Sequence, residues 1–79
     1  MAEHRPTQQE EVLWYLKTYG TITALEGFKE LYIIDLAGCI RDLRKLYIIS
    51  DEWIHKNNRF GRPIKYKRYI YEGKKKGVA

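Results

Sequence analysis

The chain has 79 residues, of which 44% are hydrophobic, and its length allows one small domain with a modest core. That composition excludes a disordered chain, and a single cysteine, Cys39, excludes an internal disulfide or a cysteine-based zinc site. The net charge of +5 is one-sided, because residues 1–35 hold three Lys/Arg against six Asp/Glu and residues 36–79 hold twelve against four. A basic C-terminal half of this kind suits a polyanionic partner.

Residues 1–6 carry no periodic pattern and are expected to form a loose arm. Thr7 with Glu10 three residues later is a capping-box pattern, so we predict a first helix over Gln8–Tyr19 that ends at Gly20. Its inward face is predicted to hold Val12, Leu13, Leu16 and Tyr19.

Thr21–Thr23 alternates polar and apolar residues and predicts a short extended segment with Ile22 pointing inward. Thr23 and Glu26 repeat the capping-box spacing, which predicts a second helix over Ala24–Leu31. Apolar residues at Leu25, Phe28 and Leu31 have the spacing of an inward helical stripe.

Asp35 is expected to cap a third helix from about Leu36 to Leu46. Its inward stripe is predicted to be Leu36, Ile40, Leu43 and Tyr47, and the polar residues of its outer face are mostly basic. Gly38 costs helix stability, so we expect it to permit a close approach by the second helix or by a ligand, and Cys39 to be a buried thiol.

Two segments rich in β-branched and aromatic residues follow, Ile48–Lys56 and Ile64–Tyr71, and residues 57–63 between them favour a turn. They predict a β-hairpin with a basic tip. The alternation is imperfect, so it leaves open whether Trp53 or Ile54 faces the helices. Residues 72–79 are expected to be a basic, disordered tail.

Four motifs carry a resemblance to a known family: Val12-Leu13-x-Tyr15-Leu16, Gly20-Thr21-Ile22-Thr23, Ile40-Arg41-Asp42-Leu43-Arg44-Lys45 and Asn58-Arg59-Phe60-Gly61. With their order, residues 7–71 resemble the small single-domain winged helix-turn-helix proteins of bacteria and their phages. The resemblance implies an α+β fold of three helices with a C-terminal hairpin, the wing. It also implies binding to double-stranded DNA, with the third helix in the major groove and the wing at phosphates or a minor groove.

The DNA contacts expected on this basis are Arg41, Arg44 and Lys45 on the third helix and Arg59, Arg62, Lys65 and Lys67 on the wing. The chain departs from the family where the recognition helix begins, because Ala37, Gly38 and Cys39 offer little hydrogen bonding to base edges. The function expected is that of a transcriptional regulator or an accessory factor in recombination.

A protein-binding function is the alternative, for example an inhibitor of a host or defence complex. Trp14 lies off the main stripe of the first helix, and Tyr32 and Ile34 occupy a turn that is usually small or polar. Exposed apolar residues that cluster often mark an interface, so these three are the candidate partner surface, including that of a homodimer through the first helix. RNA in place of DNA is left open.

The sequence predicts no enzyme, metal site or cofactor, because it contains no glycine-rich phosphate loop, no zinc spacing and no catalytic constellation. Asp51 and Glu52 are adjacent in a predicted strand, so their side chains point to opposite faces. The longest apolar run, residues 31–34, is far shorter than a membrane span, and the acidic start is unlike a signal peptide. We therefore expect a cytoplasmic protein.

Overall fold

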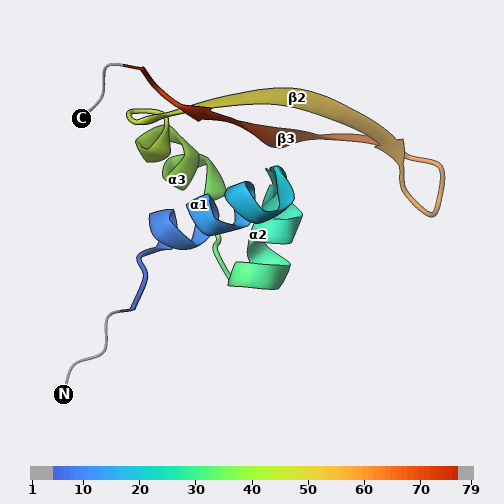
Figure 1. The fold of residues 1–79 in the computed structure, drawn as a ribbon. Helices are drawn as coiled ribbons and strands as arrows, with labels where there is room; N and C mark the ends of the chain where they lie inside the picture. Colours follow the sequence, from blue (N-terminus) through green and yellow to red (C-terminus); the bar gives the residue numbers. More distant parts are fainter. Residues whose placement is uncertain (1–4, 77–79) are drawn as a thin grey trace.

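The structure, a computed structural model, describes residues 5–76 and is a small α+β domain of three helices and a three-stranded antiparallel sheet. In chain order the elements are α1 (Gln8–Tyr19), β1 (Thr21–Thr23), α2 (Ala24–Leu31), α3 (Leu36–Leu43), β2 (Tyr47–Asn57) and β3 (Pro63–Lys74). The helices lie on one side of the sheet, and the β2–β3 hairpin runs along the top of the molecule (Figure 1). Residues 1–4 of the expected arm and 77–79 of the expected tail lie outside the described residues.

Local capping contacts set the bounds of the first two helices. Thr7 Oγ1 accepts a hydrogen bond from the Glu10 amide at 3.2 Å, while the Glu10 carboxylate accepts one from the Thr7 amide. Thr23 and Glu26 form the same reciprocal pair, and α1 ends at Gly20 with φ of 87°. The predicted bounds of α1, β1 and α2 are therefore confirmed, because each depended on contacts within a few residues.

The core lies between α1, α3 and the base of the sheet. Its buried apolar side chains are Val12, Tyr15, Leu16, Ile22, Ile33, Leu36, Cys39, Ile40, Leu43, Ile49 and Tyr69. The expectation that Tyr19 points inward is wrong, since its ring is exposed and packs at 4.6 Å against that of Tyr15, which is buried in its place. Tyr19 is the last residue of α1, and Ile22 of the following strand enters the core after the turn at Gly20.

The inward stripe predicted on α2 is also wrong. Leu25 and Phe28 are exposed at 66% and 51%, and the buried residue of this helix is Gly27. Gly27 faces the side chain of Leu36, and a Cβ at Gly27 would lie 3.5 Å from it, an ordinary van der Waals distance, so this face of α2 lies against α3. The apolar side chains of α2 are turned to the surface as a result, and only Leu31 packs partly against the core.

Helix α3 ends at Leu43, three residues before the predicted end. The amides of Lys45 and Leu46 donate to carbonyls three residues earlier, at 3.2 and 3.0 Å, which tightens the chain into a turn before β2. Asp35 caps the helix as predicted by accepting from the Gly38 amide at 3.1 Å. At Gly38 the side chain that approaches closely is that of Asp35 and not one from α2, because the Asp35 carboxylate occupies the place of a Cβ there.

The predicted hairpin is confirmed, and it is longer than expected. Strands β2 and β3 pair from Tyr47 opposite Lys74 to Asn57 opposite Pro63, with one irregularity between Ile48 and Ile49. Residues 72–74 thus belong to β3, although they were expected in the tail, because the start of β2 gives them a partner.

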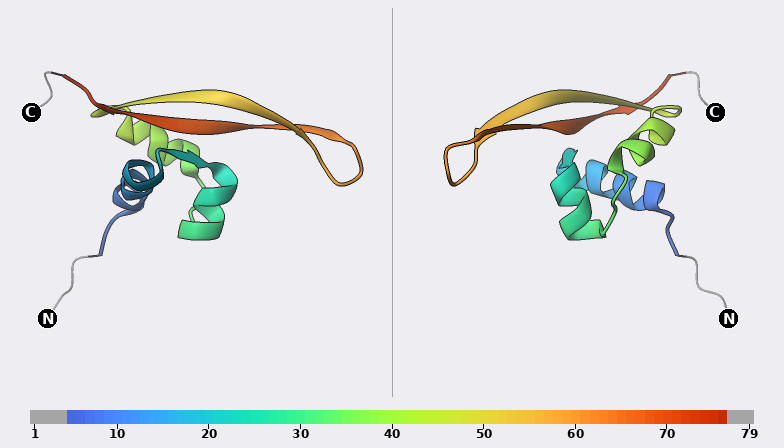
Figure 2. Two further views of the ribbon diagram at one scale, coloured as in Figure 1. Left: turned by 45° about the vertical axis from the view of Figure 1, so that its right-hand side comes forward. Right: turned by 180° about the vertical axis from the view of Figure 1, so that it is seen from behind.

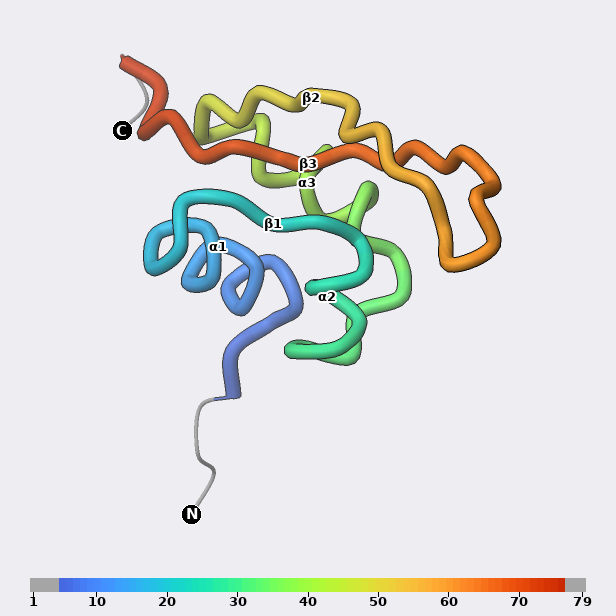
Figure 3. Tube along the Cα trace, turned by 90° about the vertical axis from the view of Figure 1, so that its right-hand side faces the viewer, coloured from blue at the N-terminus to red at the C-terminus, as the bar shows by residue number. Residues whose placement is uncertain are grey.

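The far part of the hairpin extends beyond the strand β1. Strand β1 pairs only with Arg68–Ile70 of β3, so the sheet order is β1-β3-β2 (Figure 3). We call the remaining two-stranded part, Trp53–Asn57 with Pro63–Lys67, the hairpin overhang. It projects past the helices (Figure 2) and gives the molecule its longest extent, 49 Å.

Candidate nucleic-acid interface

The tip of the hairpin presents two arginines that have no internal partner. The Asn58 side chain accepts hydrogen bonds from the amides of Phe60 and Arg62, at 2.9 and 2.8 Å, and Gly61 adopts φ of 84°, which together fix the turn. Arg59 and Arg62 are exposed, and within residues 5–76 neither guanidinium has a hydrogen bond or an ion pair. The tip therefore carries two free positive charges on an ordered turn.

One face of the overhang is aromatic and basic. Residues alternate along a strand, so Asp51, Trp53 and His55 share the face of buried Ile49, and register places Lys67 opposite Trp53 and Lys65 opposite His55. We call this the helix-side face of the hairpin. The Lys65 and Lys67 ammonium groups lie 4.8 and 5.4 Å from the centre of the Trp53 ring. Trp53, which sequence reasoning left unplaced, thus lies among the cations.

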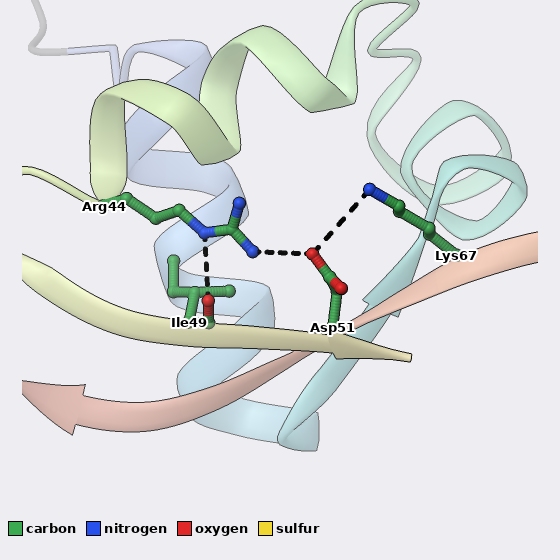
Figure 4. A network of polar contacts seen from close by, with 4 residues as sticks. All are labelled: Arg44, Ile49, Asp51 and Lys67. Carbon is green, nitrogen blue, oxygen red and sulfur yellow. Dashed lines mark hydrogen bonds and ion pairs between the residues drawn. The ribbon is translucent and has the colours of Figure 1, made fainter. Parts of the chain in front are cut away.

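A network of polar contacts joins α3 to this face (Figure 4). Arg44 donates from Nε to the Ile49 carbonyl and from Nη2 to the Asp51 carboxylate, both at 2.9 Å, and Lys67 Nζ lies 3.9 Å from the same carboxylate. The guanidinium of Arg44 also lies 5.8 Å from the centre of the Tyr69 ring. These contacts use two donor groups of Arg44 and hold the hairpin against the end of α3. The DNA contact expected of Arg44 stays a prediction.

The same network affects the titration of Asp51. Its hydrogen bond from Arg44 is the largest cause that lowers the pKa of the carboxyl, and the charges of Lys67 and Arg44 act in the same direction. Because the folded-state pKa lies below the unfolded one, this ionised carboxylate stabilises the fold above its unfolded pKa. That contribution is lost as the pH falls through the folded-state pKa.

Two further cations are exposed on α3 and in the turn that follows it. Arg41 is exposed and has no ion pair among residues 5–76, whereas Lys45 Nζ lies 3.9 Å from the Asp42 carboxylate at the exposed end of the helix. At the start of α3, Cys39 is buried as expected, and burial raises the pKa of its thiol. The early turns of α3 thus offer few groups that could hydrogen-bond to a base.

The three residues expected at a partner surface are all exposed, and the rings of Trp14 and Tyr32 make separate ring contacts. Trp14, Tyr32 and Ile34 are exposed at 57%, 78% and 87%. Trp14 contacts the rings of Tyr15 and Tyr19 on α1, whereas Tyr32, in a left-handed conformation at the end of α2, contacts Phe28. The homodimer through α1 stays a prediction.

Sequence reasoning missed a second apolar surface on α2. Leu25 and Phe28 are exposed near Tyr32 in the chain, and Leu25 also borders a groove of about 590 Å³. The groove is lined by Thr21, Thr23, Leu25, Glu26, Ile54, Lys56, Ile64, Tyr66 and Arg68. It lies on the face of the hairpin opposite the aromatic and basic one.

Residues 5–76 contain no cluster of three or more His, Cys, Asp or Glu that could hold a metal ion. Over the same residues, none of the helices has the length and apolar character needed to cross a membrane. In comparisons with known proteins, no family model, no curated protein and no solved structure matches this chain.

Proposed function

We propose that the chain is a winged-helix protein that binds double-stranded DNA and has no reaction of its own. The observation that carries the proposal is the projecting hairpin, whose tip holds Arg59 and Arg62 without a side-chain partner among residues 5–76 and whose overhang adds Lys65. Phosphate contacts supply most of the affinity of such proteins, and they are made by Lys and Arg side chains that are available to neutralise phosphates. Its role would be that of a transcriptional regulator or an accessory factor in recombination, in a bacterium or a phage.

In this arrangement the hairpin acts as the wing and α3 as the recognition helix. Arg41 on α3 and Lys45 just after it would approach the DNA, while Arg44 holds the wing at a fixed position through Asp51. Ala37 and Gly38 give the start of α3 little capacity to distinguish bases. Affinity would therefore come chiefly from the wing, and sequence preference from Arg41.

Separate substitutions in the wing and in α3 test this division. Arg59→Ala and Arg62→Ala should each weaken binding roughly eightfold at about 0.1 M salt, to all duplex sequences alike, because each removes one phosphate contact. Arg41→Ala should change which sequences are preferred, because this residue can reach base edges. Selection from a random duplex library with each variant measures both effects.

Lys29→Ala on α2 is the control, since it removes one exposed charge outside the proposed interface. It should leave both affinity and preference nearly unchanged. If Arg41→Ala and the two wing variants all reduce affinity equally across the library, then α3 does not read sequence, and the protein is a non-specific or architectural binder.

A protein-binding function remains the second candidate, and the exposed apolar side chains of α2 and its following turn favour it. Leu25, Phe28, Tyr32 and Ile34 are each at least half exposed, which is unusual for four large apolar residues within ten positions. An inhibitor of a host or defence complex would use such a surface. Under this function Phe28→Ala should abolish activity while the wing variants have no effect.

A further inference from the structure

The helix-side face of the hairpin continues beyond the core as a surface of different chemistry. At the base of the hairpin this face consists of Ile49, Tyr69 and Tyr71, which pack on the helices. Along the overhang the same face consists of Trp53, His55, Lys65 and Lys67. The alternation continues along both strands, so an aromatic and cationic set takes the place along the overhang that core side chains take at the base.

Trp53 is the centre of this set. Its side chain is 52% exposed, and the ammonium groups of Lys65 and Lys67 lie 4.8 and 5.4 Å from the centre of its ring. The one carboxylate on this face, Asp51, is paired with Arg44 and Lys67, so its charge is compensated within the protein. An anion approaching Trp53 would therefore meet the two ammonium groups that β3 places over its ring.

An exposed indole between two ammonium groups matches the chemistry of an unpaired nucleotide. A base stacks on the aromatic ring, and the phosphates on either side of that base meet the cations. A base inside a duplex is stacked between its neighbours and cannot offer a free face to the ring. The surface therefore favours single-stranded over double-stranded nucleic acid.

We propose that Trp53 is a stacking platform for an unpaired base of single-stranded DNA, with Lys65 and Lys67 as its phosphate contacts. The proposal rests on the proposed function and extends it. Where the duplex beside Arg41 and the wing tip is opened, the overhang holds a single strand, and Lys65 then contacts a phosphate of that strand in place of a duplex phosphate. Such a junction occurs where a duplex is opened, as in recombination intermediates.

The chain supplies its own matched control in Trp14. This residue is 57% exposed, close to the value for Trp53, but its ring contacts Tyr15 and Tyr19 instead of cations. The chain contains only these two tryptophans. Trp14→Phe therefore leaves Trp53 as the sole indole fluorophore, and Trp53→Phe leaves Trp14.

The test is a fluorescence titration of both variants with oligothymidylate, together with anisotropy measurements of affinity for oligothymidylate and for a duplex. Oligothymidylate should quench the Trp53 signal strongly and the Trp14 signal little. Trp53→Ala should weaken oligothymidylate binding roughly 5- to 150-fold, which is the cost of losing one stacked base, and Trp53→Phe should restore most of it. Duplex affinity should change less than about twofold in Trp53→Ala, because cations contact the duplex phosphates and this variant keeps every cation.

The outcomes separate the two proposals. Duplex binding without quenching of Trp53, or an equal loss of both affinities in Trp53→Ala, overturns the stacking platform and leaves the proposed function standing. Quenching by oligothymidylate without any duplex binding supports the platform and overturns the proposed function. Binding to neither nucleic acid overturns both.

Discussion

Replacing Arg59, Arg62 and Lys65 together by glutamine should lower affinity for duplex DNA roughly 500-fold at about 0.1 M salt. Each phosphate contact releases about 0.9 of a counterion, which is worth roughly eightfold in affinity at that salt concentration, and three independent contacts multiply. The slope of log affinity against log salt should become shallower by about 2.7. Fluorescence anisotropy with a labelled random duplex measures both quantities.

The control is a second triple variant that has the same net charge but loses its three cations elsewhere on the protein. Lys29, Lys74 and Lys75 are exposed residues outside the proposed contacts, and replacing them with glutamine also lowers the net charge by three. This variant should retain affinity within a few-fold. An equal loss in both variants would mean that overall charge, and not the hairpin, governs binding.

Leu16→Ala should reduce the free energy of unfolding by about 3–5 kcal/mol, because it removes a large side chain from a fully buried position. A domain of this size has a total stability of roughly 4–12 kcal/mol, so the variant should be partly or wholly unfolded. Urea unfolding followed by circular dichroism gives the value.

Leu25→Ala makes the same chemical change on the exposed face of α2, where the side chain is 66% accessible. It should cost less than about 1 kcal/mol, because no comparable cavity is created. If Leu16→Ala and Leu25→Ala reduce the free energy of unfolding equally, then Leu25 is a core residue, as the sequence pattern predicted. The orientation of α2 would then be incorrect.

The elements that could be predicted from the sequence are those whose bounds depend on local contacts. Thr7 and Thr23 each bond to the amide three residues later, and Gly20 adopts a conformation that favours glycine, so a few residues decide where α1 and α2 begin and where α1 ends. The hairpin was predictable for the same reason, since two segments rich in β-branched residues flank a turn built around Asn58.

The orientation of α2 could not be predicted, because an apolar stripe shows that a helix has an apolar face without showing what covers it. Leu25 and Phe28 have the spacing of core residues, yet the contact with Leu36 is made through Gly27, which has no side chain to mark it in a hydropathy pattern. The glycine within this amphipathic helix was the one sequence feature that indicated which face packs against α3.

The site was predictable in composition but not in detail. Arg44 belongs to a basic run, and only the short turn after Leu43 brings it to the Ile49 carbonyl and to Asp51. The place of Trp53 depended on whether Ile48 or Ile49 faces the core, and two adjacent isoleucines with a register irregularity between them give no hydropathy signal for that choice.

The salt dependence of binding to random duplex DNA tests the central proposal most directly. Five cations are available for phosphate contacts: Arg41, Lys45, Arg59, Arg62 and Lys65. About five contacts predict a slope of log affinity against log salt near −4.5, with clear binding at roughly 50 mM salt. No detectable binding at that concentration, or a slope near zero, would contradict DNA binding through this surface.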